Sequence, residues 1–171
     1  MATKILRNNS ANLNALGYRK GSVAQPFNMR IMGLDLGDKR IGVALSDSMG
    51  WTAQGLEVIA HPGSQKAAVE KVLELAQKYE AEGIVVGFPV NMNGSHGGRA
   101  EKAKRFARQL AAGSDLQVDL WDERLTTMEA EKLLLSADVS RSKRRKVIDK
   151  MAAALILQGY LDNRTHMRGE K

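Results

Sequence analysis

The chain has 171 residues, of which 43% are hydrophobic and 26% charged, as is typical of a soluble globular protein with a single domain. It contains no cysteine, which excludes disulfides, thiol catalysis and cysteine-ligated metal clusters, and fits a cytoplasmic location. No apolar run is long enough to cross a membrane, whereas the net charge of +7 indicates a polyanionic partner such as nucleic acid.

Residues 1–28 differ from the rest of the chain in composition. With Met29 they hold four of the 26 Lys and Arg residues and no acid, which leaves 22 bases against 19 acids elsewhere. We expect a basic, flexible extension, and three origins stay open: a leader from an expression vector, an arm that contacts nucleic acid, or an organelle-targeting peptide. A leader is favoured, because compact structure can begin at Met29. The folded domain should span residues 29–162, followed by a flexible tail over 163–171.

The first predicted elements form a β-hairpin. Two apolar runs, Ile31–Leu36 and Ile41–Leu45, flank the short segment Gly37–Lys39, which is typical of two strands joined by a tight turn. A third strand, Gly55–Ala60, follows after a short link. Short links favour antiparallel pairing, so these strands should form a meander.

Helical and extended patterns then alternate along the chain. The spacing of apolar residues predicts, in order, a helix over 64–81, a strand Ile84–Phe88, a helix Gly98–Ala112, a strand Gln117–Trp121, a helix from the capping box Thr126–Glu129 to about Ser136, and a helix Val147–Leu161. The last helix should present Val147, Met151, Leu155 and Leu161 on one face, after a basic linker. Strands separated by helices are expected to be parallel. The predicted fold is therefore α/β, with a mixed five-stranded sheet of three antiparallel strands followed by parallel strands, and helices on both faces.

Three carboxylates are positioned to converge at one end of this sheet. Asp35 lies within the first strand among apolar neighbours, Glu123 follows the fifth strand, and Asp149 lies in the last helix among small apolar residues. Each has an ordinary alternative, since a surface carboxylate or a turn would use the same residue types. Gathered together, such hard oxygen ligands suit Mg²⁺ or Mn²⁺.

Two basic features favour contact with phosphates. A loop rich in Gly and Asn follows the fourth strand and ends at Arg99, at the positive end of a helix, although a purely structural turn would have the same composition. His96 lies in that loop, and we assign it no role. A cluster of five cations within six residues comprises Arg141, Lys143, Arg144, Arg145 and Lys146.

Four ordered motifs resemble the YqgF family. They are Ile31–Asp47, Val86–Gly94, Asp122–Ala130 and Ile148–Gln158, and the resemblance runs from about Arg30 to Asp162. It implies a ribonuclease-H-like fold related to the RuvC Holliday junction resolvases, and activity as a resolvase or as the nuclease that matures pre-16S ribosomal RNA. The family's acidic triad then falls on Asp35, Glu123 and Asp149, which makes them the implied catalytic metal ligands. Phe88, Val90 and Gly98 depart from the commoner leucine, leucine and proline.

The function expected from these features is metal-dependent hydrolysis of phosphodiester bonds in precursor rRNA or branched DNA, by a monomer or a homodimer. One alternative is a nucleic-acid-binding module without turnover, using the same basic cluster. Another is a phosphotransferase, because Asp35-Leu36-Gly37 before a hairpin also resembles the phosphate-binding turn of actin-like sugar kinases. Those proteins need two lobes to enclose ATP, and this chain has room for one.

Overall fold

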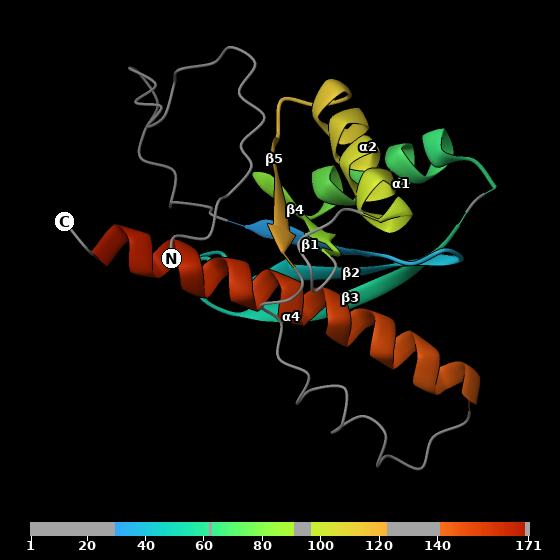
Figure 1. The fold of residues 1–171 in the computed structure, drawn as a ribbon. Coiled ribbons are helices and arrows are strands. Elements are labelled where there is room, and N and C mark those ends of the chain that lie inside the picture. The colour runs from blue at the N-terminus through green and yellow to red at the C-terminus, as the bar shows by residue number, and fades with distance from the viewer. Residues whose placement is uncertain (1–29, 62, 91–96, 123–140, 170–171) are drawn as a thin grey trace.

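A five-stranded sheet forms the centre of the molecule (Figure 1). The computed structural model describes residues 30–61, 63–90, 97–122 and 141–169, with the side chains of 146–165 in the last range. The strands lie in the spatial order β3-β2-β1-β4-β5. Their bounds are β1 (Ile31–Leu36), β2 (Arg40–Ser46), β3 (Ala53–Ala60), β4 (Gly83–Phe88) and β5 (Gln117–Asp122).

The pairing directions confirm the predicted mixed sheet. β1 pairs antiparallel with β2, and β2 pairs antiparallel with β3, which makes the expected meander. β4 pairs parallel with both β1 and β5. Helix α1 (Gln65–Lys78) connects β3 to β4, and α2 (Gly98–Ala112) connects β4 to β5. The helix predicted to begin at Thr126 lies outside the described residues.

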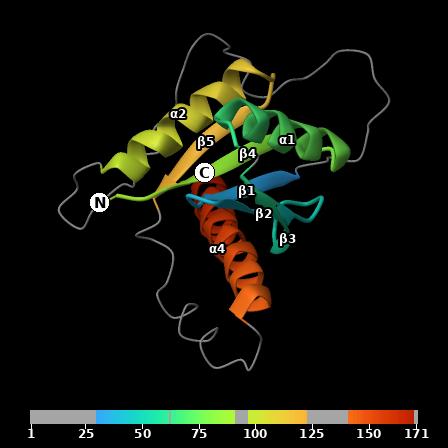
Figure 2. The ribbon, with the colours of Figure 1, turned by 90° about the vertical axis from the view of Figure 1, so that its right-hand side faces the viewer.

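Helices cover both faces of the sheet, as predicted. α1 and α2 pack on one face, and α4 (Arg141–Gly169) packs on the other (Figure 2). The Ser64 side chain caps α1 by accepting a hydrogen bond from the Ala67 N–H at 3.2 Å, which satisfies one of the free donors of the first turn. No helix in the described ranges is long and apolar enough to cross a membrane.

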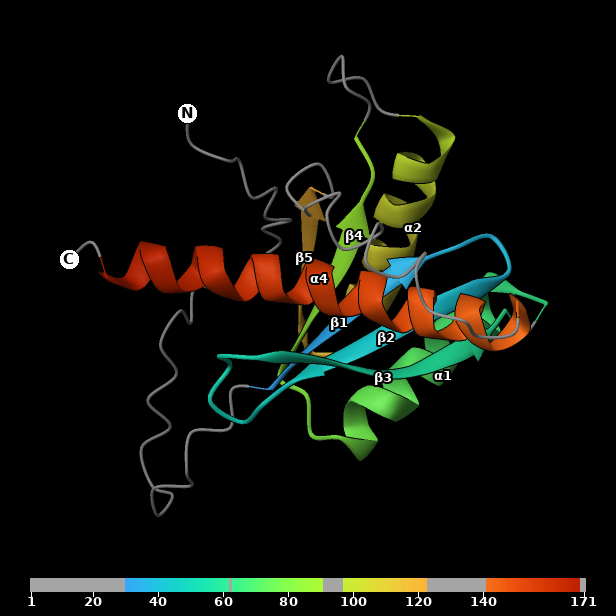
Figure 3. The same cartoon turned by 90° about the horizontal axis from the view of Figure 1, so that it is seen from below.

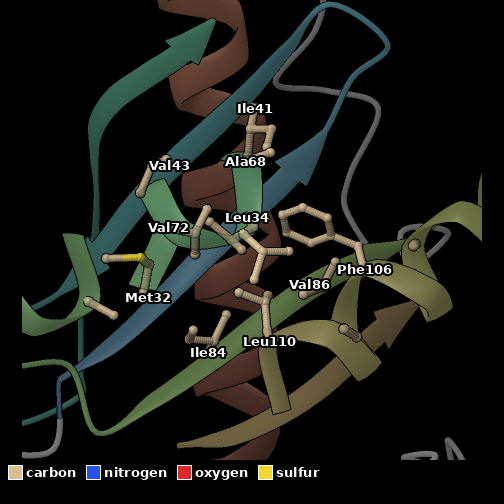
Figure 4. Packing of buried hydrophobic residues seen from close by; sticks show 14 of the residues in the cluster. Met32, Leu34, Ile41, Val43, Ala68, Val72, Ile84, Val86, Phe106 and Leu110 are labelled. Atoms are coloured by element: carbon tan, nitrogen blue, oxygen red, sulfur yellow. The ribbon is translucent and has the colours of Figure 1, made fainter. Parts of the chain in front are cut away.

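Alternation along β1 divides the hydrophobic core into two layers. Met32 and Leu34 contribute to the layer beneath α1 and α2, where they join Val72 and Phe106 (Figure 4). Ile31, one residue out of phase, belongs to the layer beneath α4. Asp35 has the same parity as Ile31, so its side chain is on the α4 face of the sheet.

Glycines on three adjacent strands allow α4 to lie close to the sheet, which it crosses over β1, β2 and β3 (Figure 3). A Cβ atom at Gly33 would lie 2.7 Å from the Leu157 Cβ, and one at Gly55 would lie 2.8 Å from the Lys150 Cβ. At Gly42 a Cβ would collide with the backbone carbonyl oxygen of Asp149. The absence of side chains at these positions therefore sets the depth at which the helix packs.

The sequence-based bounds of the last helix were wrong at both ends. α4 begins at Arg141, so the segment expected to be a basic linker is helical, and it continues to Gly169 through most of the expected flexible tail. Lys and Arg are good helix formers, and no glycine or proline interrupts residues 141–158. Beyond Leu161, the Thr165 hydroxyl donates to the Leu161 carbonyl oxygen at 3.0 Å within the continuing helix.

The predicted inward face of this helix was also largely wrong. Val147 is 45% exposed, and Met151 and Leu155 are only partly buried. Among the described side chains of α4, the buried ones are Ala153, Ile156, Leu157, Tyr160 and Leu161, of which the prediction included Leu161 alone. The close approach of α4 to Gly33 turns Ala153 and Leu157 toward the sheet, and the neighbouring Ile156 and Tyr160 are buried with them.

Candidate active site

The functional end of the sheet is expected where its parallel strands finish, because ligands bind beyond the carboxyl ends of such strands. In the register of the sheet Leu34 of β1 lies opposite Val86 of β4, and Phe88 lies opposite Asp122 of β5. The ends of β1, β4 and β5 therefore meet at one edge. Asp35, the next residue after Leu34, lies at this edge.

Asp35 lies in an environment that disfavours its charged form. Its partner in the antiparallel pair with β2 is Gly42, over which the Asp149 backbone of α4 packs. Burial and, secondarily, the negative charge of Asp149 raise the pKa of Asp35 from 3.8 to about 6, while the Arg99 guanidinium acts in the opposite direction. A carboxylate with this pKa in a sheet edge is a candidate functional group.

Asp149 is held over β2 by its backbone and by its side chain. Its carbonyl oxygen lies where Gly42 leaves space, and its carboxylate Oδ2 accepts a hydrogen bond from the Arg40 Nε at 2.8 Å. The side chains of Arg40 and Asp149 are 33% and 25% exposed. The structure thus brings Asp35 and Asp149 together from elements that are more than 100 residues apart in the sequence.

The third predicted ligand, Glu123, lies outside the described residues. Asp122 ends β5 at the same sheet edge as Asp35, and Glu123 is the next residue in the chain. Within the described ranges, no group of three or more His, Cys, Asp or Glu side chains is arranged to hold a metal ion. The complete triad therefore stays a prediction, and only its Asp35–Asp149 part can be examined geometrically.

Cationic side chains from α2 border this edge. Arg99, in the first turn of α2, is 73% exposed and forms an ion pair with Asp38 at 3.6 Å. Lys102 Nζ approaches the other oxygen of Asp38 at 3.4 Å, and its hydrogen bond lowers the Asp38 pKa, with further lowering by Arg99. Arg99 therefore connects α2 to the β1–β2 turn, and its charge acts on Asp35. His96 lies outside the described residues.

The predicted basic cluster forms the first turns of α4. Lys146 is exposed and precedes Asp149 by three residues, slightly less than one helical turn of about 3.6 residues. The backbone of 141–145 is helical, but the side chains of Arg141, Lys143, Arg144 and Arg145 lie outside the described part. One continuous helix therefore connects the backbone of the cluster to Asp149.

Sequence reasoning missed two residues that contact this pair. The importance of Gly42 could have been found, because a hairpin turning at Gly37–Lys39 predicts that Gly42 pairs with Asp35. The contact of Arg40 with Asp149 had no local signal, since it joins residues separated by 109 positions.

The chemistry of the pair suits a divalent cation. Asp35 and Asp149 offer hard carboxylate oxygens, and burial of two such groups near each other is unfavourable unless a positive charge compensates them. Arg40 supplies one such charge, at Asp149. Asp35 makes no ion pair within the described residues, so a cation at this edge has an available anionic ligand.

Comparisons with known proteins point to one family. The chain matches a family model described as "RuvX: Holliday junction resolvase" over residues 29–163. A protein of Pelotomaculum thermopropionicum is 64% identical over 142 residues, which cover 83% of this chain and 92% of that protein. A protein of Bacillus subtilis is 57% identical over 136 residues, which cover 79% of this chain and 99% of that protein. Both relatives carry the name "Putative pre-16S rRNA nuclease".

A solved structure described as "T. thermophilus RuvC in complex with Holliday junction substrate" has a similar fold. It aligns with a TM-score of 0.52 at 17% identity, over 80% of this chain and 97% of that chain. This likeness concerns the fold alone, and it confirms the predicted ribonuclease-H-like architecture.

Proposed function

Since this chain belongs to the RuvX (YqgF) family of Holliday junction resolvases, we propose that it is a divalent-metal-dependent nuclease acting on structured nucleic acid. Its class is that of enzymes that hydrolyse phosphodiester bonds, as the names of its family and relatives indicate. The observation that carries metal dependence is the Asp35–Asp149 pair, because a buried carboxylate beside a second negative charge provides a binding site for a cation.

Precursor 16S rRNA is the first substrate to test. Relatives with 57% and 64% identity are named for it, whereas the RuvC likeness extends only to the fold. We infer cleavage at the 5′ end of the mature 16S sequence, with Holliday junctions as the second candidate. The cytoplasmic location expected from the cysteine-free sequence is part of this proposal.

The residues have separate tasks in the proposed reaction. Asp35, Asp149 and Glu123 would hold Mg²⁺ or Mn²⁺, while Arg99 and the basic cluster bind the phosphate backbone. When bound, a divalent ion supplies Lewis-acid stabilisation of the charge that develops at the phosphate and lowers the pKa of a bound water. The packing of the Asp149 backbone over Gly42 fixes the position from which its side chain extends before substrate arrives, which reduces the reorganisation that the reaction requires.

Cleavage assays with both substrates test this function. Purified wild type and Asp35→Asn should be incubated with precursor 16S rRNA and with a four-way DNA junction, with and without Mn²⁺, and the cut ends mapped. We expect Mn²⁺-dependent cleavage with 5′-phosphate products by the wild type only. Full cleavage by Asp35→Asn would contradict the assigned site. Binding without cleavage at any Mn²⁺ concentration would favour the alternative of a non-catalytic module.

A further inference from the structure

Arg40 occupies a structurally defined position beside the carboxylate pair. It begins β2 immediately after the turn, where the Gly37 N–H donates to the Arg40 carbonyl oxygen at 2.9 Å. It precedes Gly42 by two residues, so both lie on the α4 face of the sheet. Gly42 pairs with Asp35, and Asp149 packs over Gly42. Arg40 therefore extends from the same surface as Asp35 toward the helix that carries Asp149.

The contact between Arg40 and Asp149 is directional and partly buried. The Nε–H donates to Oδ2 at 2.8 Å, with both side chains at most one-third exposed. Charge-assisted hydrogen bonds of this length are among the stronger polar contacts in proteins. In the described part of the chain this is the hydrogen bond that holds the Asp149 side chain, and it engages Oδ2 rather than Oδ1. The carboxylate can thus keep its bond to Arg40 while its other oxygen meets a cation.

We propose that Arg40 is a positioning residue for the hydrolysis, which holds the Asp149 carboxylate in the orientation that binds metal beside Asp35. This inference rests on the proposed function. Two like charges at this edge repel, so without the guanidinium the Asp149 side chain would rotate away from Asp35 toward solvent. Hydrogen-bonding partners that orient metal-binding carboxylates commonly change metal affinity or activity by about 10–100-fold when they are removed.

Mn²⁺ binding without nucleic acid gives the first test, measured by electron paramagnetic resonance. Arg40→Met keeps an unbranched chain as far as the position of Nε but removes the donor and the charge, and we expect Mn²⁺ affinity to fall by about 10–100-fold. Arg40→Lys keeps a cation and a donor and should recover part of this loss. A matched control is Arg30→Met, because Arg30 precedes β1 at the opposite end of the sheet, where it donates to the Tyr79 carbonyl oxygen at 3.3 Å. This control should bind Mn²⁺ like the wild type.

Nuclear magnetic resonance of the metal-free protein tests the contact itself. The Arg40 Nε–H should exchange slowly with solvent in the wild type and rapidly in Asp149→Ala. The same spectra establish whether each variant is folded. Rapid exchange in the folded wild type would overturn the inference.

A double-mutant cycle in the cleavage assay separates positioning from direct contact with substrate. If Arg40 acts through Asp149, Arg40→Met should cost little further activity in an Asp149→Ala background, which removes the acceptor. An equal loss in both backgrounds would overturn the inference, as would unchanged or tighter Mn²⁺ binding by Arg40→Met. Failure of the proposed function would look different, because the wild type would then bind Mn²⁺ normally and cleave neither nucleic acid.

Discussion

The fold makes the ionised form of Asp35 unfavourable. Burial and the charge of Asp149 raise its pKa to about 6, whereas an unfolded chain would have a value near 3.8. Between these values the folded protein binds a proton that the unfolded chain releases, so stability decreases as pH rises through this window. Above pH 6 the ionised carboxylate remains an unfavourable group until a cation binds.

Because the ionised Asp35 carboxylate destabilises the folded state, Asp35→Asn should stabilise the metal-free protein. At pH 8 the free energy of unfolding should increase by up to about 3 kcal/mol, the equivalent of the rise in the Asp35 pKa from 3.8 to about 6. The gain should shrink toward pH 4, where the wild-type carboxyl is protonated. Urea titrations of both proteins between pH 4 and pH 8 measure it. A variant that is less stable than wild type at pH 8 would contradict the assignment of the raised pKa.

Proton and metal should compete at Asp35, because the carboxyl must be ionised to hold a cation. Cleavage at fixed Mn²⁺ is therefore expected to fall as pH decreases through about 6. Raising the Mn²⁺ concentration should move the midpoint of this fall to lower pH. Rates measured from pH 5 to pH 8 at several Mn²⁺ concentrations provide the check. A midpoint that stays constant across these concentrations would show that another group controls the profile.

At the scale of elements, the glycines beneath α4 determine where Asp149 lies. The helix contacts β1, β2 and β3 through positions without side chains, so a small change in the sheet displaces a catalytic candidate on the helix. Because interiors are closely packed, such a displacement cannot be absorbed locally. Stability and geometry of the site are therefore coupled at Gly42.

Gly42→Ala should reduce both stability and cleavage. Its Cβ would collide with the Asp149 carbonyl oxygen, and overpacking of this kind costs about 1–3 kcal/mol or more. Urea unfolding and the cleavage assay measure the two losses. Gly83→Ala is the matched strand control, because its Cβ would make an ordinary contact of 3.4 Å with the Gln117 carbonyl oxygen. If both substitutions have equal effects, close approach of α4 at Gly42 is not the cause.

At the scale of the whole molecule, basic residues lie on helices at both faces of the sheet, since α2 carries several Lys and Arg residues and Glu101 as its acid. The basic cluster belongs to α4 on one face of the sheet, whereas α1 on the other face pairs Lys66 with Glu70 and Lys71 with Glu74. A polyanion that reaches Asp35 would meet the α4 side, where the cluster precedes Asp149. With Arg99 on α2, the proposed phosphate contacts therefore come from both sides of the sheet edge that holds Asp35.

Replacing Lys143, Arg144, Arg145 and Lys146 with Ala should weaken nucleic-acid binding and its dependence on salt. For duplex substrate, loss of up to four phosphate contacts lowers the slope of log affinity against log salt by up to about 3–4. Fluorescence anisotropy at salt concentrations from roughly 50 to 300 mM measures the affinity and therefore this slope. The control is Lys66→Ala with Lys71→Ala on α1, which should keep the wild-type slope. An unchanged slope in the cluster variant would show that residues outside the cluster make the phosphate contacts.

Local patterns in the sequence were sufficient to predict most of the helices and strands that the structure describes. The bounds of Ile31–Leu36 and Gly98–Ala112 were predicted as observed, since alternation and helical spacing depend on near neighbours. The order of the elements then determined the mixed sheet, because short links favour antiparallel strands and helical crossovers favour parallel ones. The motifs around Asp35 and Asp149 were likewise sufficient for the family.

The tertiary structure alone decided the surroundings of those residues. The buried face of α4 depends on how deeply the helix packs over Gly33, Gly42 and Gly55, which its own apolar pattern does not encode. The bond from Arg40 to Asp149 and the raised pKa of Asp35 arise from contacts between distant segments. By itself the sequence determined the order of most elements and pointed to Asp35, Glu123 and Asp149 as the candidate ligands. Only the packing of α4 against the sheet decided the distances and charges among them, because electrostatic interactions depend on separation and burial in space.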